Sequence, residues 1–185
     1  MKVTLFGAAF DPPHLGHQKI ASTLLKQNLA EEVWLLPVKD HAFGKEMISE
    51  KHRLAMLQTL IKPKVRIETY ELDQTTASIT FNTLRALRAK HPKHEFSFLI
   101  GADNLARFHE WDDYLIMLQE FTFFVYPRAG YELKPLYSGM EVLTGVKEID
   151  VSSTQVKEWV RQGRSIKNLV SPAVGEYIGQ HKLYG

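Results

Sequence analysis

The chain has 185 residues, of which 44% are hydrophobic and 24% are charged, and this fits one globular domain over residues 1–185. Its 23 lysine and arginine residues nearly balance its 21 aspartate and glutamate residues, so composition gives no reason to expect a disordered chain or a nucleic-acid partner. Because the chain has no cysteine, disulfides, iron–sulfur clusters and thiol catalysis are excluded.

Short apolar segments rich in β-branched or aromatic residues alternate with helical patterns along the chain. The predicted strands are residues 3–6, 33–36, 65–70, 96–101 and 121–126, and the predicted helices are residues 15–29, 51–61 and 80–90. The last of these helices stops at His91 because the residue before a proline is pushed out of the helical conformation. This alternation predicts an α/β fold, a doubly wound Rossmann-like parallel sheet with helices on both faces. Ligands of such sheets bind beyond the carboxyl ends of the strands.

Residues 7–17, Gly-Ala-Ala-Phe-Asp-Pro-Pro-His-Leu-Gly-His, connect the first predicted strand to the first helix. We expect Gly7 to end the strand at a sharp turn, and Gly16 to let the backbone approach a ligand closely. His14 and His17 are three residues apart, so both imidazoles address the partly positive start of the helix, where they suit a nucleotide phosphate. We also expect His17 to contribute little to core packing. Two other interpretations stay open: a zinc site with Asp11 as third ligand, and two exposed histidines without special contacts.

This pattern, Gly-x-x-Phe-Asp-Pro-x-His-x-Gly-His, resembles the signature of the nucleotidyltransferase superfamily, which transfers an adenylyl or cytidylyl group to a phosphate. Residues 151–157, Val-Ser-Ser-Thr-Gln-Val-Lys, open a late amphipathic segment and are similar to a second signature, Ile-Ser-Ser-Thr-x-Ile-Arg, whose hydroxyls and N–H groups hold the triphosphate. Taken alone, Ser152 or Ser153 indicates only a helix N-cap. Lys157 replaces the usual arginine and offers a point charge instead of a planar fork, and Arg161 is a candidate to compensate.

Two central segments resemble the nicotinate and nicotinamide mononucleotide adenylyltransferases within that superfamily. Residues 98–105 and the following His-Glu-Trp at 109–111 are similar to that family's Gly-x-Asp-x-Leu and tryptophan block, and residues 78–84 are similar to its Ser-Tyr-Thr-x-x-Thr-Leu segment. Asp103 can accept hydrogen bonds from ribose hydroxyls, and Trp111 can stack on a pyridinium ring. Thr80 can orient the carboxylate or amide of that ring. The alternatives are a packing role for Trp111 and a helix cap for Thr80.

The loop at residues 37–45 lacks the bacterial Pro-Pro-His-Lys sequence and is more similar to the eukaryotic-type enzymes of the same activity. The preference between nicotinate and nicotinamide therefore stays open. Lys45, at the end of this loop, is a candidate phosphate ligand, and the alternative is a solvated lysine.

The resemblance implies transfer of AMP from ATP to nicotinate or nicotinamide mononucleotide, giving a dinucleotide and pyrophosphate in NAD biosynthesis. The 5′-phosphate would attack the α-phosphorus in line, so catalysis needs alignment and charge stabilisation but no protein nucleophile. The expected catalytic residues are His14, His17 and Lys45. The expected ATP-binding residues are Gly7, Ala8, Phe10, Gly16, Gly101, Asp103, Ser152, Ser153, Thr154 and Lys157, and the expected mononucleotide-binding residues are Thr80 and Trp111. Mg²⁺ is expected as a cofactor held by the phosphates, with no protein metal cage.

Two rival functions stay open. One is transfer to another acceptor phosphate, such as phosphopantetheine or a sugar phosphate, and the other is a nucleotide sensor without turnover. The expected partners are ATP and a pyridine mononucleotide, and a homo-oligomer stays open. No apolar run approaches the roughly 20 residues that cross a bilayer, and the first residues enter a strand rather than a signal segment, so we expect a cytoplasmic protein without a membrane partner.

Overall fold

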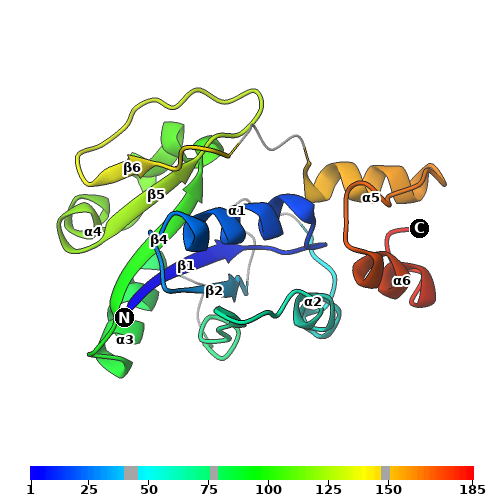
Figure 1. Cartoon of the computed structure of the whole chain (residues 1–185), viewed down its shortest axis with the longest axis horizontal. Helices are drawn as coiled ribbons and strands as arrows, with labels where there is room; N and C mark the ends of the chain where they lie inside the picture. The colour runs from blue at the N-terminus through cyan, green and yellow to red at the C-terminus, as the bar shows by residue number, and fades with distance from the viewer. Residues whose placement is uncertain (40–45, 76–78, 147–150) are drawn as a thin grey trace.

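The computed structural model of the chain describes residues 1–39, 46–75, 79–146 and 151–185. A six-stranded sheet lies at its centre, with the strand order β3-β2-β1-β4-β5-β6 and parallel pairing between neighbours. The strands are β1 Lys2–Ala8, β2 Glu32–Pro37, β3 Val65–Ile67, β4 Glu95–Gly101, β5 Thr122–Tyr126 and β6 Met140–Val142. The helices are α1 Leu15–Lys26, α2 Glu50–Gln58, α3 Thr80–Lys90, the 3-10 helix η1 Ala102–Glu110, α4 Tyr114–Glu120, α5 Ser153–Arg161 and α6 Pro172–Gln180. The predicted α/β doubly wound fold is therefore confirmed (Figure 1).

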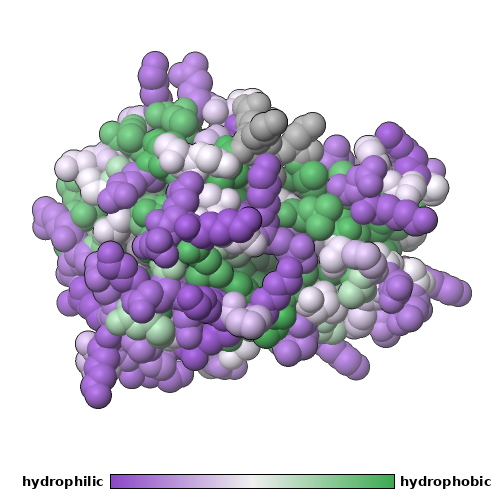
Figure 2. Space-filling view, in the orientation of Figure 1, coloured by the Kyte–Doolittle hydropathy of each residue, from purple (hydrophilic) through white to green (hydrophobic). Residues whose placement is uncertain are grey.

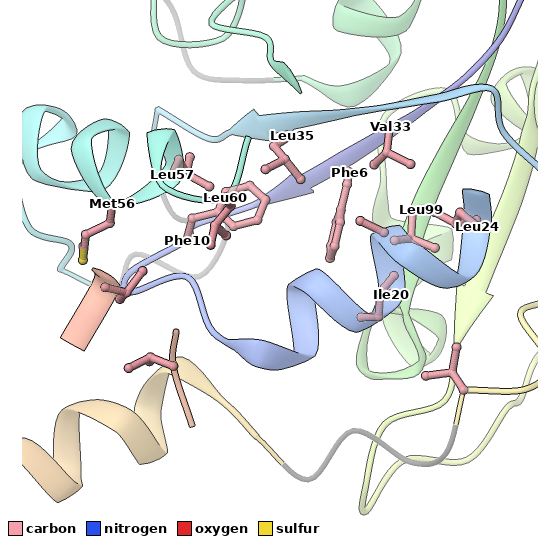
Figure 3. Packing of buried hydrophobic residues seen from close by; sticks show 14 of the residues in the cluster. Phe6, Phe10, Ile20, Leu24, Val33, Leu35, Met56, Leu57, Leu60 and Leu99 are labelled. Carbon is pink, nitrogen blue, oxygen red and sulfur yellow. The ribbon is translucent and has the colours of Figure 1, made fainter. Parts of the chain in front are cut away.

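Each face of the sheet carries its own hydrophobic core, because successive side chains of a strand point to opposite faces. Phe6 of β1 belongs to the core that includes Ile20 and Leu24 of α1, and Figure 3 shows these three residues between the sheet and that helix. Its neighbour Leu5 belongs to the other core, together with Leu84 of α3. Hydrophilic residues cover most of the face in Figure 2, with smaller hydrophobic areas between them. Both faces of the sheet are thus covered by hydrophobic cores. The edge formed by the carboxyl ends of the strands is left for a ligand.

The strand order reverses at β1, which lies between β2 and β4. β1 ends at Ala8 and β4 ends at Gly101, and the register that pairs Phe6 with Leu99 brings these ends to the same edge of the sheet. Such a switch point is where open α/β sheets bind ligands. The motifs that follow β1 and β4 in the sequence therefore face one region.

Every predicted element differs from the observed one by at most three residues at either end, and the three predicted over residues 15–29, 51–61 and 65–70 each end three residues earlier than expected. The strand predicted over residues 65–70 ends at Ile67, because the chain turns next and the N–H of Leu72 donates to the carbonyl of Thr69 at 2.9 Å. The helix predicted over residues 15–29 ends at Lys26, two residues before Asn28, which has a φ of +56° in the left-handed region. In the described part of the chain, no helix is long and apolar enough to span a membrane.

Candidate active site

A cavity of about 1020 Å³ opens at the carboxyl ends of the strands. This volume is at the upper end of the range for small-molecule sites, so it has room for more than one small ligand. Twelve of the predicted site residues line it: Gly7, Ala8, Phe10, His14, His17, Thr80, Gly101, Asp103, Trp111, Ser153, Thr154 and Lys157. Gly16 and Ser152 are not among the lining residues found in the described part of the chain, and Lys45 lies outside the described residues.

Gly7 has a different role from the one predicted, because β1 does not end there. It pairs with Leu36 of β2 inside the strand, and the chain turns only at Phe10, where φ is +48°. A Cβ atom at Gly7 would lie 2.8 Å from Cζ of Phe98, so the missing side chain makes room for that ring. At Gly101 a Cβ would lie 2.3 Å from Oδ1 of Asp103. Both glycines therefore permit close packing of side chains at the floor of the cavity.

The two histidines stand together at the start of α1. The N–H of His14 donates to Nδ1 of His17 at 3.0 Å, and the two rings stack with their centroids 3.7 Å apart. Both residues are buried, and the ring of His17 lies 5.5 Å from Phe6 and 4.9 Å from Phe10. The expectation that His17 contributes little to packing is therefore wrong, and so is the alternative of two exposed histidines.

Burial makes both imidazoles neutral in the free protein. Burial, together with the nearby positive charge of Arg128, lowers the pKa of His14 from its usual 6.5 to about 3. The pKa of His17 is also well below its usual value, because of burial first and then the charges of His14 and Arg128. Since Nδ1 of His17 accepts a hydrogen bond, the proton of its neutral ring is on Nε2. The histidines thus act as hydrogen-bonding groups in the free site.

These pKa shifts predict a loss of stability in mild acid. Above pH 6.5 the unfolded chain also holds neutral histidines, so the stability is complete there. Below pH 6.5, these histidines bind protons in the unfolded chain but stay neutral in the folded protein. The unfolding free energy then falls by about 1.4 kcal/mol per pH unit for each of His14 and His17, until the pKa of that histidine in the folded protein is reached. Urea unfolding at pH 7.5 and 5.5 measures this loss, and His17→Asn should reduce it by about half. An unfolding free energy that is equal at both pH values would contradict the burial argument.

Asp103, at the start of η1, forms an ion pair with a residue that the sequence analysis missed. Nη1 of Arg128, two residues after β5, lies 2.5 Å from Oδ2 of Asp103, and Arg128 also lines the cavity. Oδ1 of Asp103 is buried and has no hydrogen-bond partner among the described residues, so it is available to accept hydrogen bonds from a ligand. The sequence could have indicated this residue, because Arg128 is a basic side chain just beyond the end of a predicted strand, residues 121–126, and parallel strands end at the same edge of the sheet.

The start of α5 contacts the loop between β1 and α1. The Ser152 hydroxyl is the N-cap of α5 and accepts from the N–H of Gln155 at 3.1 Å, which confirms the helix-cap interpretation for this serine. The Ser153 hydroxyl instead donates to the carbonyl of Pro12 at 2.9 Å. Nζ of Lys157 lies 2.7 Å from Oδ2 of Asp11. Two motifs far apart in the sequence therefore form adjacent walls of the cavity.

Arg161 does not reinforce Lys157 in the way we expected. Its side chain is 59% exposed, it pairs with Glu158 at 3.8 Å, and it is not among the lining residues found in the described ranges. The residue lies one turn beyond Lys157 on α5, on a part of the helix that faces solvent. Among the described residues, the cations that line the cavity are Arg107, Arg128, which follows β5, and Lys157.

The predicted zinc alternative does not fit the geometry. Nδ1 of His17 already accepts a hydrogen bond, and both oxygens of Asp11 are occupied, by Lys157 and by the hydroxyl of Tyr184 at 2.7 Å. In the part of the chain that the structure describes, no group of three or more histidine, cysteine or acidic side chains could hold a metal ion.

Thr80 and Trp111 both line the cavity. Thr80 is the first residue of α3, and Trp111 directly follows η1. The N-cap of α3 is Ile79, which forms no side-chain cap, and Thr80 follows it inside the helix, so the cap interpretation of Thr80 is wrong. The Trp111 ring is partly buried, with its centroid 5.1 Å from Phe108 and 6.4 Å from Phe98. Trp111 thus packs against the protein and also borders the cavity, which agrees with both interpretations of this residue.

Comparison with known proteins gives consistent results at the level of sequence. A family model described as cytidylyltransferase-like matches residues 5–159. The probable nicotinate-nucleotide adenylyltransferase of Geobacillus kaustophilus is 35% identical over 188 residues, covering 100% of this chain and 86% of that protein. That of Bacillus pumilus is 34% identical, covering 99% of this chain and 98% of that protein.

Solved structures show the same fold. The nicotinic acid mononucleotide adenylyltransferase of Plasmodium falciparum complexed with NaAD superposes with a TM-score of 0.82 at 20% identity, covering 99% of this chain and 97% of that chain. A putative nicotinate-nucleotide adenylyltransferase from Vibrio parahaemolyticus superposes with a TM-score of 0.75, also at 20% identity, covering 99% of this chain and 94% of that chain. At this level of identity the likeness concerns the architecture, including the sheet on which the cavity is built.

Proposed function

The chain belongs to the cytidylyltransferase-like family and, within it, to the nicotinate-nucleotide adenylyltransferases, and from this premise we propose that it transfers AMP from ATP to nicotinate mononucleotide. The products are the dinucleotide and pyrophosphate, in a reaction of NAD biosynthesis. One observation of the structure supports this function at the cavity. Both phosphate-binding signatures, at residues 7–17 and 151–157, meet at the same cavity through the Ser153–Pro12 and Lys157–Asp11 contacts.

In the proposed mechanism, the triphosphate of ATP lies between the starts of α1 and α5. The neutral His17 offers its Nε2–H to the α-phosphate, while Lys157 and Arg128 supply positive charge that burial has removed from the histidines. The 5′-phosphate oxygen of the mononucleotide attacks the α-phosphorus, and the bond to the β-phosphate oxygen breaks. The attacking oxygen is already anionic, so the protein aligns the groups and stabilises charge without accepting a proton.

Mg²⁺ belongs to this mechanism as an ion carried by the phosphates. The residues fit that arrangement, because Asp11 and Asp103 are already paired with Lys157 and Arg128, so these two carboxylates are neutralised by cations of the protein. When bound to the phosphates, Mg²⁺ would neutralise the leaving pyrophosphate. Lys45 remains the proposed further phosphate ligand.

An acceptor screen tests the function. The protein is incubated with ATP, Mg²⁺ and one acceptor at a time: nicotinate mononucleotide, nicotinamide mononucleotide, phosphopantetheine or a sugar phosphate. Pyrophosphate release and dinucleotide formation should be fastest with nicotinate mononucleotide. Faster release with an acceptor that lacks a pyridine ring would overturn the substrate. Binding of ATP by calorimetry with no release across the screen would indicate a nucleotide sensor instead.

Trp111→Ala should weaken the mononucleotide and leave ATP almost unaffected. An indole stacked on a pyridinium ring contributes about 0.5 to 2 kcal/mol, so KM for the mononucleotide should rise roughly 2-fold to 30-fold. Because the ring also packs on Phe108, the variant should be less stable as well. Trp111→Phe keeps an aromatic face and serves as the matched control, with a smaller rise in KM. Equal rises in KM for both substrates would argue against a stacking role and for a packing role alone.

A further inference from the structure

The last residues of the chain hold the loop between β1 and α1, defined here as residues 9–14. The hydroxyl of Tyr184, next to the final residue, donates to Oδ1 of Asp11 in this loop at 2.7 Å. Just after the loop, the N–H of Leu15 donates to the carbonyl of Leu169 at 2.9 Å. Figure 1 shows α5, α6 and the C-terminus together at the end of the molecule where α1 begins. The C-terminal segment is therefore part of the support of the proposed phosphate site.

Asp11 connects this segment to the cavity. It is 1% exposed, and its two carboxylate oxygens have different partners: Oδ1 accepts from Tyr184, and Oδ2 pairs with Nζ of Lys157 at 2.7 Å. The ammonium of Lys157 also lies 5.7 Å from the ring centroid of Tyr184. Asp11 and Lys157 line the cavity, and Tyr184 is not among the lining residues found in the described part of the chain. Tyr184 thus contacts two residues that line the cavity, Asp11 and Lys157.

A lysine at this position needs such support more than an arginine would. Its ammonium sits on a flexible four-carbon stem and has three donors, in place of the rigid fork of a guanidinium. Oδ2 of Asp11 takes one donor of Lys157 and leaves two for phosphate oxygens. A carboxylate held at only one oxygen can turn about its bond to Cβ, and then it would no longer fix the ammonium. The hydroxyl of Tyr184 on the second oxygen prevents that rotation.

Tyr184 is partly buried against the hydrophobic core that includes Phe6 and Ile20. Its backbone has a φ of +68°, in the left-handed region that side chains larger than glycine seldom adopt, so the surrounding contacts must compensate for this conformation. The N–H of the preceding Leu183 donates to the carbonyl of Ile178 in α6 at 3.1 Å. Burial and the neighbouring Asp11 raise the pKa of the Tyr184 hydroxyl well above its usual range, so it stays a proton donor at every working pH.

We propose that Tyr184 is a positioning residue for ATP, which fixes Asp11 so that Lys157 presents its free donors to the triphosphate. This role rests on the proposed adenylyl transfer. Tyr184→Phe removes only the hydroxyl and should raise KM for ATP about tenfold, the size expected when a hydrogen bond to a charged group is lost, with kcat and KM for the mononucleotide nearly unchanged. Tyr177→Phe is the matched control, because its partly buried hydroxyl bonds to Nδ1 of His52 in α2 at 3.0 Å, away from the residues found to line the cavity, and KM for ATP should not change.

A double-mutant cycle with Lys157→Ala distinguishes positioning from simple loss of stability. If Tyr184 acts through Lys157, the change Tyr184→Phe has no further effect on KM for ATP once Lys157 is replaced by alanine. A purely structural role would raise KM by the same factor in both backgrounds, and that result overturns the proposal. Unfolding midpoints of all variants are measured in parallel, and the kinetics are measured well below the lowest midpoint.

The inference and the proposed function can fail separately. If the wild-type protein releases no pyrophosphate with any acceptor, adenylyl transfer is wrong, and calorimetric binding of ATP to the same variants still tests the positioning role. In that experiment, Tyr184→Phe should weaken ATP about tenfold in the wild-type background and have no effect in the Lys157→Ala background. Unchanged ATP affinity in Tyr184→Phe overturns the positioning role in an active or an inactive protein.

Discussion

Replacing His17 with alanine is expected to lower turnover about 100-fold, the loss typical of removing one preorganised donor from a developing charge. The N–H of His14 keeps Nδ1 of His17 as an acceptor, so the ring presents its Nε2–H as the donor. In the proposed mechanism this donor meets the α-phosphate, whose charge redistributes as the new bond forms. KM for ATP should change much less than kcat, because Lys157 and the start of α5 also bind the ground-state triphosphate.

Two further substitutions of His17 separate its donor from its structural role. Asparagine can still accept the hydrogen bond from the N–H of His14 but has no donor at the position of Nε2, so its turnover should be as low as that of alanine. Glutamine places an amide N–H near that position and should recover part of the turnover. Steady-state assays of pyrophosphate release measure both. If the asparagine variant is as active as the wild type, His17 does not stabilise the reacting phosphate.

The same three variants should also differ in stability, because the ring of His17 is 7% exposed and lies against Phe6 and Phe10. Alanine leaves a cavity and an unpaired N–H at His14, and we expect it to cost about 2 kcal/mol of unfolding free energy. Asparagine should cost less, because it keeps the acceptor. A loss of turnover that followed this order of stability would indicate a structural cause, whereas a loss that follows the donor indicates catalysis.

The sequence predicted the parts of the site that depend on local chemistry. Histidines at positions 14 and 17 and hydroxyls at 153 and 154 lie at helix starts that follow strands in the chain, and parallel strands all end at one edge of the sheet. The alternation of strands and helices therefore sufficed to place these groups in one cavity. The same reasoning placed Gly7 and Gly101 there. The role predicted for Gly7 was wrong, because a side chain at this position would collide with Phe98, which lies in a strand 91 residues further along the chain.

The features that sequence reasoning missed depend on contacts between distant residues. Tyr184 and Asp11 are 173 residues apart, and neither residue type at its position indicates the other. The burial of His14 and His17 depends on β1 and the β1–α1 loop packing around them, so their loss of charge could not be predicted from their spacing. β6 and α4 have three and seven residues, which is too short to show a hydrophobic period.

Arg128→Ala should lower kcat/KM about 100-fold, the second of the two largest effects we expect. The guanidinium lies at the cavity, cannot lose its proton, and is close enough to lower the pKa of both histidines. With His14 and His17 neutral, Arg128 and Lys157 carry the positive charge that an incoming triphosphate meets. Arg128→Lys keeps the charge without the fork and should recover part of the rate. Arg161→Ala, on the exposed part of α5, is the control and should leave kcat/KM unchanged.

A second measurement on Arg128→Ala does not depend on activity. Removing a positive charge that lowers the pKa of His14 should raise that pKa, which an NMR titration of the imidazole C–H signals detects. The variant also leaves Asp103 without its partner at 2.5 Å, and this lone carboxylate would itself repel phosphate. Adding Asp103→Asn removes that repulsion. If the double variant is as active as Asp103→Asn alone, Arg128 serves only to neutralise Asp103; if it is slower than Asp103→Asn alone, the charge of Arg128 acts on the reacting phosphates.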